Sequence, residues 1–474
     1  MSQRASLVRH PVSIAGALIT TTAAVVFFAL LIASMFGLFE NPYAGLVVFV
    51  ALPALFVLGL LLIPLGMWLQ RRKIARDPDS VDDWPVVDFR ISRVHRMALL
   101  FTALTALNVV IILVAGYGSL HYMESPTFCG QTCHTPMHPQ FNAWKAGIHA
   151  RTACVDCHVA EGAKGFLHAK LAGTRQLYHV MTGGFPRPIP PGANVPPGGH
   201  NLTCGRCHQP TKTAGDVIKV VREYADDEAN SETMTVLLMH VGRANPSGRA
   251  IHWHADPATK VEFASPDHSR QAIPYVKVTD ATGQVKEYFG TDVTAPPAGA
   301  ALRTMDCVDC HNQVGHRISP SAALAVDAAI AGGQIPRTLP FARREGIRVL
   351  EATYASEDAA TQGIDQEIRK FYASQGRPVD HQEVGRAVAA LQNAYRSNVF
   401  PSMKVTWGSY PYNTGHTASP GCLRCHDGSL TAKDGSKIND DCEYCHRQVE
   451  TPPTTITALR GADVVARSAQ IAGR

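Results

Sequence analysis

The sequence predicts a mainly α protein in which three N-terminal transmembrane helices precede a water-soluble domain with a small β section. Three observations lead to this fold class: three long uncharged apolar runs in the first 120 residues, a polar remainder in which cysteines and histidines recur, and short alternating stretches between residues 260 and 290. A chain of 474 residues is too long for one compact domain. Its 46% hydrophobic content excludes a disordered protein, and a diffuse net charge of +5 gives no nucleic-acid surface.

The three apolar runs cover residues 11–39, 41–70 and 97–120, and none contains a charged side chain. Each exceeds the roughly 20 residues that a helix needs to cross the hydrocarbon core of a membrane. The first run is longer than the apolar region of a cleavable signal peptide, so we expect it to be retained. Residues 1–120 are therefore predicted to form a membrane anchor of three helices.

Basic residues predict the orientation of this anchor. They precede the first run and fill the segment between the second and third runs: Arg4, Arg9, Arg71, Arg72, Lys73, Arg76, Arg90, Arg93 and Arg96. The positive-inside rule places both segments in the cytoplasm and everything after residue 120 on the other side. We therefore expect a bacterial inner-membrane protein with a periplasmic C-terminal domain.

No histidine lies inside an apolar run, because His10, His95 and His121 all fall at the edges. A b-type haem within the membrane needs paired histidines at depth, so the sequence excludes one.

All twelve cysteines fall into six motifs of one kind. Five are C-x-x-C-H. The remaining motif, CGQTCH, comes first in the chain and has one extra residue between its cysteines. The cysteine pairs are Cys129 and Cys133, Cys154 and Cys157, Cys204 and Cys207, Cys307 and Cys310, Cys422 and Cys425, and Cys442 and Cys445. The histidines that follow them are His134, His158, His208, His311, His426 and His446.

C-x-x-C-H is the attachment signal of c-type haem, in which two thiols form thioethers to the porphyrin and the adjacent imidazole binds the iron. Zinc sites, redox dithiols and disulfides are the alternatives, but none of them requires a histidine after every second cysteine. The sequence therefore predicts six covalently bound haem c groups in a periplasmic multihaem cytochrome c domain. The extra residue at Cys129 and Cys133 changes that loop, and support for its haem comes from the flanking residues.

Several further side chains are candidates for the second axial position of the irons. A lone histidine is more often a surface or core residue, so local context selects among them. The selected histidines lie close to a motif or beside an apolar run: His149, His240, His252, His254, His316 and His416. Met137 stands three residues after His134; as a ligand it would raise that iron's potential, and packing is its alternative role.

The stretch HYMESPTFCGQTCHTPMHPQFNAWKAGIHARTACVDCHV resembles the N-terminal region of the NapC/NirT/NrfH quinol dehydrogenases. These membrane-anchored multihaem cytochromes oxidise menaquinol or ubiquinol and pass electrons to periplasmic partners. The resemblance covers roughly residues 115–185. It implies a methionine ligand at Met137, a distal ligand at His149 and a quinol-pocket lysine at Lys170. Usual members have one anchor helix and four or five haems. This chain has three spans, six motifs and the CxxxCH spacing. In these respects it is more similar to larger inner-membrane cytochromes of metal-respiring bacteria.

Residues 161–182 are predicted to form an amphipathic helix with one apolar and one basic face. Such a helix suits the membrane surface. Lys170 falls in the middle of the apolar face, where its ammonium would hydrogen-bond a quinol oxygen; a side chain that only reaches the headgroups is the alternative. Glu124, four residues past the third run, is a candidate proton acceptor, with surface solvation as its alternative.

The remaining sequence predicts a two-haem region with the quinol site at residues 121–186 and a four-haem region at residues 187–474. Strands are expected over KVEFAS, AIPYVKVTD and QVKEYFG, with a turn at ATGQ, and helices near 340–354, 358–374 and 381–398. Residues 187–199 form a proline-rich connector. The two close C-terminal motifs are candidates for the electron exit.

Together these features predict a membrane-bound hexahaem cytochrome that oxidises quinol and reduces a periplasmic acceptor protein. Two alternative functions remain open. In the first, the chain is a terminal reductase with its own substrate-binding haem. In the second, it is a passive electron-transfer subunit of a larger respiratory complex.

Overall fold

The computed structural model describes residues 10–35, 47–76, 92–132, 134–160, 162–190, 200–208, 216–242, 250–267, 269–296, 302–376 and 378–449. The chain divides into two compact units. The first contains residues 1–137 with 153–155, and the second contains residues 138–152 with 156–474. Most of the predicted proline-rich connector and the C-terminal tail lie outside the described residues.

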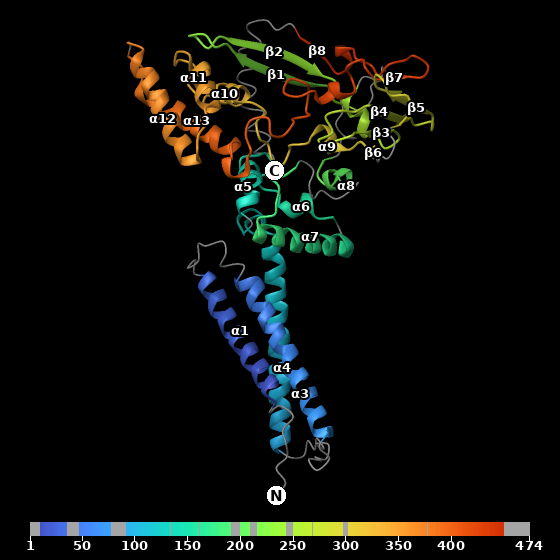
Figure 1. Cartoon of the computed structure of the whole chain (residues 1–474), viewed down its shortest axis with the longest axis vertical. Coiled ribbons are helices and arrows are strands. Elements are labelled where there is room, and N and C mark those ends of the chain that lie inside the picture. The colour runs from blue at the N-terminus through green and yellow to red at the C-terminus, as the bar shows by residue number, and fades with distance from the viewer. Residues whose placement is uncertain are drawn as a thin grey trace. The chain divides into compact units, whose positions relative to one another are not determined.

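The first unit is built from three long helices, drawn in blue to cyan in Figure 1: α1 (Pro11–Met35), α3 (Leu52–Arg76) and α4 (Ser92–Glu124). A π-helical turn, Val47–Ala51, precedes α3, and a second one, Phe128–Thr132, follows α4. Each long helix contains a stretch that is long and apolar enough to cross a membrane, namely Pro11–Leu30, Leu52–Lys73 and Thr102–Glu124. The predicted three-helix membrane anchor is confirmed.

Helices α1 and α3 pack closely because small residues line their contact. A Cβ atom added at Gly16 would lie 2.7 Å from the carbonyl oxygen of Gly59. The hydroxyl of Ser13, which is fully buried, donates a hydrogen bond to the carbonyl of Ile63 at 3.0 Å. Without a hydrophobic driving force in lipid, such close backbone approach and interhelical hydrogen bonds hold membrane helices together.

The second unit contains five helices that precede or carry cysteine motifs: α5 (His134–Lys145), which begins in the first unit, α6 (Cys154–His158), α7 (Gly162–Thr182), α8 (His200–Gly205) and α9 (Cys307–Cys310). The predicted amphipathic helix at 161–182 is thus observed as α7. Its apolar side chains are largely exposed, with Leu167, Leu171 and Met181 at 60%, 64% and 79%.

Two antiparallel sheets lie in this unit. The strands β1 (Val217–Tyr224), β2 (Glu232–Met239) and β8 (His446–Gln448) form one sheet in that order. The other has the order β6-β3-β4-β5-β7, with β3 (Lys260–Ala264), β4 (Tyr275–Thr279), β5 (Val285–Phe289), β6 (Arg303–Thr304) and β7 (Thr431–Ala432). The three predicted strands are confirmed as β3, β4 and β5. Gly283 at the turn between β4 and β5 has φ +84°, a value that favours glycine.

A helical module without cysteines separates the fourth and fifth motifs. It consists of α10 (Ala322–Ala331), α11 (Ala342–Glu351), α12 (Glu357–Ser374) and α13 (His381–Asn398). The predicted helices near 340–354, 358–374 and 381–398 correspond to α11, α12 and α13. The module has its own core, whose fully buried members include Val326, Val349, Ile364 and Leu391. Figure 1 shows the module at one side of this unit and the five-stranded sheet at the other.

Asn230, in the turn between β1 and β2, joins the first sheet to the helical module. Its side-chain amide donates to the carbonyls of Arg337 at 3.1 Å and Leu339 at 2.8 Å, and its oxygen accepts from the amide of Arg343 at 2.9 Å. The residue is fully buried and has φ 46°. Asparagine tolerates this left-handed conformation better than most residues.

We expect Asn230→Ala to lower the free energy of unfolding of this unit by about 2–4 kcal/mol, because three backbone groups lose the partner that the buried amide provides and alanine is strained at this φ. Thermal melting followed by circular dichroism measures the loss. Asn230→Gly is the matched control: it loses the same hydrogen bonds without the strain, so it should melt between the wild type and the alanine variant. An alanine variant as stable as the wild type would contradict this role.

Candidate haem centres

The C-x-x-C-H motifs adopt tight helical turns that bring the two cysteines of each pair together. In α9 the amide of His311 donates to the carbonyl of Cys307 at 2.8 Å, and Asp306 caps the turn by accepting from the amide of Val308. The amide of His208 makes the same bond to Cys204 at 2.8 Å. One turn therefore separates the two thiols of a motif, and its histidine follows directly.

The CxxxCH motif has a different local geometry. Its first cysteine, Cys129, lies in the π-helical turn Phe128–Thr132 together with the three residues that follow it. A π turn holds more residues than an α turn, since its hydrogen bonds join residue i to i+5. The wider turn takes up the extra residue. Cys133 and the side chain of His134 lie outside the described residues.

The cysteine chemistry agrees with a covalent cofactor. No disulfide joins the cysteines that the structure describes. In the same described part of the chain, no three His, Cys, Asp or Glu side chains gather into a site for a metal ion. A structural zinc site needs four such ligands, so the zinc alternative finds no site among the described residues.

Five motif histidines each face one histidine from elsewhere in the chain. The pairs, with the distances between ring centres, are His158 and His316 at 5.9 Å, His208 and His149 at 6.0 Å, His311 and His252 at 6.4 Å, His426 and His254 at 5.9 Å, and His446 and His416 at 6.0 Å. Every pair contains one histidine that ends a motif and one that does not.

These distances fit a metal between the rings. Two imidazoles bound to one metal from opposite sides have ring centres roughly 6.4–6.6 Å apart, since each metal–nitrogen bond is about 2.0–2.1 Å and each ring centre lies about 1.2 Å behind its nitrogen. Rings joined directly by a hydrogen bond would be roughly 5.3 Å apart. The observed 5.9–6.4 Å is longer than this direct contact and close to the separation across a haem iron.

Backbone carbonyls fix the tautomer of several of these imidazoles. The Nδ1 atom of His316 donates to the carbonyl of Gln140 at 3.0 Å, and that of His149 to Val314 at 3.1 Å. A carbonyl only accepts hydrogen bonds, so Nδ1 carries the hydrogen and Nε2 keeps its lone pair for a metal. The same arrangement holds for His254, bonded to Ile251 at 2.7 Å, and for His426, bonded to Asn439 at 2.6 Å.

Burial favours the neutral form of these rings. It is the largest cause that lowers the pKa of five of the paired histidines, namely His252, His254, His311, His316 and His446. Neutral imidazole is the form that binds iron, so the protein environment and the metal require the same protonation state.

Two other predicted ligands have different surroundings. The Nδ1 atom of His240 lies 3.0 Å from a carboxylate oxygen of Asp216, and its backbone bonds to Cys445 and Ile251 at 2.8 Å each. His240 forms none of the five ring pairs within the described residues. Met137 is half-buried in α5. The ligand roles of both residues stay predictions.

The two residues predicted to handle quinol lie on separate helices. Lys170 is on α7, half-exposed, with its ammonium 4.9 Å from the centre of the Phe166 ring. Large apolar side chains surround it on the same helix face and are all exposed: Phe166, Leu167, Leu171, Leu177, Tyr178 and Met181. Glu124 is the last residue of α4 and is half-buried.

Comparison with known proteins gives two findings. The family model for the N-terminal region of NapC/NirT cytochromes c matches residues 92–188. The cytochrome c-type protein ImcH of Geobacter sulfurreducens is 35% identical to the chain over 450 residues, which cover 93% of this chain and 88% of that protein. The chain belongs to the NapC/NirT cytochrome c family. No solved structure matches it.

Membership in the NapC/NirT family establishes a membrane-anchored c-type cytochrome with covalently bound haem that takes part in electron transfer. The matched region includes α4, the first two cysteine motifs and α7. It therefore contains the predicted haem ligands Met137 and His149 and the predicted quinol-site residues Glu124 and Lys170.

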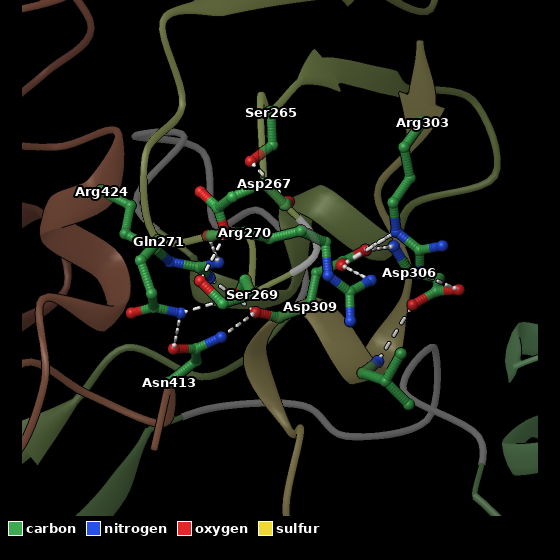
Figure 2. A network of polar contacts seen from close by, with 11 residues as sticks. Ser265, Asp267, Ser269, Arg270, Gln271, Arg303, Asp306, Asp309, Asn413 and Arg424 are labelled. Carbon is green, nitrogen blue, oxygen red and sulfur yellow. Dashed lines mark hydrogen bonds and ion pairs between the residues drawn. The ribbon is translucent and has the colours of Figure 1, made fainter. Parts of the chain in front are cut away.

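Sequence reasoning missed a buried charged network beside the fourth and fifth motifs (Figure 2). Asp309, the second intervening residue of CVDCH, is 1% exposed and accepts hydrogen bonds from Arg270 at 2.9 Å and Arg303 at 3.0 Å. Burial raises the pKa of Asp309, and Arg303 acts against that rise. The two residues between the cysteines of such a motif vary freely, so the sequence gives no sign that an aspartate there is buried and bonded to arginines.

Arg424, the second intervening residue of CLRCH, connects this network to the next motif. Its guanidinium donates to the backbone carbonyls of Asp309 at 2.6 Å, Arg270 at 2.9 Å and Gly421 at 2.7 Å. Figure 2 shows Asn413 beside them, and its amide lies 3.4 Å from the same Asp309 carbonyl. The fourth and fifth attachment loops are thereby held together.

Replacing Asp309 by alanine should destabilise the haem domain by about 3–5 kcal/mol, because Arg270 and Arg303 lose the carboxylate that compensates their partly buried charges. Chemical unfolding followed by circular dichroism tests this. The control is Asp365→Ala, which breaks the exposed pair with Arg369 and should cost about 0.3–0.5 kcal/mol. Equal losses of unfolding free energy in the two variants would show that the buried network contributes no more than an exposed ion pair.

Proposed function

We propose that this cytochrome is a hexahaem quinol dehydrogenase of the bacterial inner membrane. It oxidises menaquinol or ubiquinol at the periplasmic face and passes the electrons along its haems to a periplasmic acceptor protein. The observation that carries the proposal is the exposed apolar face of α7, which is interrupted by Lys170 and follows directly after the second haem motif.

The exposed side chains of α7 form a surface suited to lipid or a lipid-soluble ligand. Contiguous apolar side chains are rarely left in water without a function, and a helix with one apolar and one basic face suits the membrane interface. A quinol is itself an apolar ring and tail with two hydroxyl groups. It therefore needs an apolar surface with one or two polar groups, and Lys170 beside Phe166 supplies this combination.

In the proposed reaction the ammonium of Lys170 donates a hydrogen bond to a quinol oxygen and stabilises negative charge as the hydroxyl loses its proton. Oxidation of one quinol breaks two O–H bonds and releases two electrons and two protons. The carboxylate of Glu124 is the proposed first proton acceptor. A bound haem would supply an iron that takes up one electron at a time, so the two electrons of one quinol would leave in two steps.

The facing histidines support electron transfer as the task of the haem domain. We assign His316, His149, His252, His254 and His416 as the distal ligands opposite the histidines of the second to sixth motifs, on the ring separations of 5.9–6.4 Å. In the first motif, Cys129 and Cys133 would attach the haem, and His134 and Met137 would bind its iron. A methionine ligand raises the potential of that haem.

These assignments disfavour the two alternatives. A terminal reductase needs an iron with an open position, whereas five sites are closed by two histidines each. A passive subunit has no need for a lysine within an exposed apolar surface. The proposed orientation, with the basic loop at 71–96 in the cytoplasm and the haem domain in the periplasm, follows the positive-inside rule.

We expect Lys170→Met to slow haem reduction by a menaquinol analogue roughly 10- to 100-fold, the range that loss of one charged hydrogen bond implies. Stopped-flow absorbance of the purified protein in detergent measures the rate. Arg175→Met is the matched control, because it removes a positive charge from the exposed basic face of the same helix. Dithionite should reduce both variants as fast as the wild type. Equal quinol rates for wild type and Lys170→Met would remove the lysine from the site, and no reduction of the wild type would end the quinol proposal.

A pyridine haemochrome assay on protein of known concentration should give six haems per chain. The double variant Cys129→Ala and Cys133→Ala should give five, since only the first motif loses its thioethers. The reduced wild-type protein should bind little carbon monoxide, because the irons have two protein ligands. Five haems in the wild type would exclude the CxxxCH motif, and strong carbon monoxide binding would favour the reductase.

A further inference from the structure

We infer that the short turn Ile251–Ala255 ligates two different haems, through His252 to the iron of the Cys307–His311 motif and through His254 to the iron of the Cys422–His426 motif, and so joins them into one rigid two-haem unit. The inference rests on the proposed ligation of haem by facing histidines. It is independent of quinol oxidation.

The geometry of the turn sends the two imidazoles in different directions. The segment IHWHA forms a 3₁₀ helix, in which successive side chains are about 120° apart, so residues two positions apart point to different sides. The ring centre of His252 lies 6.4 Å from that of His311, and the ring centre of His254 lies 5.9 Å from that of His426. One turn thus reaches two motifs that are far apart in the sequence.

The turn is held firmly in place. The amide of Ile251 donates to the carbonyl of His240 at 2.8 Å, and the amide of Asp256 closes the turn on Trp253 at 3.1 Å. Trp253 packs against the apolar face of the five-stranded sheet, in a cluster that includes Phe263. Its ring also contacts the ring of His254 edge to face, 5.6 Å between centres. The distal ligands therefore sit on the sheet and do not depend on a free loop.

The two attachment loops are fixed to each other on the cysteine side. Arg424 of one motif bonds to the carbonyl of Asp309 in the other, and the hydroxyl of Thr414 donates to the carbonyl of Cys310 at 2.9 Å. The two motifs are therefore neighbours, and the pair of irons is constrained from both axial sides.

A two-haem unit of this kind has a functional consequence. Electrons moving between the two irons cross a distance set by a turn and by a hydrogen-bonded contact, so thermal motion changes it little. The ring planes of the two ligand pairs also differ, at 45° for His252 and His311 and 88° for His254 and His426. Because the angle between axial imidazole planes shapes the signal of low-spin ferric haem in electron paramagnetic resonance, the two haems have separate signatures.

The test uses the full-length holoprotein with His252→Met and His254→Met, made singly and together. A thioether in place of an imidazole raises the potential of its haem. Each single variant should shift one haem upward in a spectroelectrochemical titration, and the double variant should shift two. In electron paramagnetic resonance, His254→Met should remove a strongly axial low-spin signal, as expected for nearly perpendicular rings, and His252→Met should remove a less axial one. Trp253→Phe is the control and should keep both signals.

Two outcomes would overturn the inference: the two single variants change the same haem, or neither changes any. Should a methionine variant fail to fold, His252→Gly with added imidazole provides the same information. Its affected haem should be high-spin without imidazole and low-spin with it, and absence of that rescue would count against the assignment. All readouts use dithionite or ferric protein, so failure of the quinol proposal leaves this test unaffected.

Discussion

Two imidazole rings held about 6 Å apart, one from a haem attachment motif and one from a distant segment, are the constraint on which the haem domain depends. The hydrophobic clusters described for this domain are concentrated in the helical module and the five-stranded sheet. The cysteine motifs themselves lie in short helical turns. With a haem between the rings of each pair, covalent and coordinate bonds would supply the long-range connections that apolar packing supplies elsewhere.

The membrane helices, helix α7 and the helical module have different structural roles. The close contact of α1 and α3 through Gly16 and Gly59 holds the anchor together in lipid, where hydrophobic association cannot. Helix α7 keeps an apolar face exposed, which a water-soluble domain would avoid without a reason. The helical module of α10–α13 carries no cysteine, and it stabilises its surroundings through its own core and through Asn230.

Histidines that are neighbours in the sequence face different motif histidines. His311 and His316 lie in one segment, yet they face His252 and His158 respectively. Likewise His149 stands just before the second motif but faces the histidine of the third. Proximity in sequence is thus a poor guide to which histidine faces a motif, because the fold brings each motif together with a remote segment.

The sequence by itself predicted the three apolar helices, the cysteine motifs and the family, because a span length and a cysteine spacing are local properties of the chain. It also identified α7, α11–α13 and β3–β5 through their periodicity, whereas β1, β2 and the alanine-rich α10 were missed. Only the tertiary structure decided which histidines face each other, and it placed His240 beside Asp216. Only the fold revealed the contact of Arg424 with the Asp309 carbonyl. These pairings join residues from remote segments, and their geometry is set by packing that no local pattern encodes.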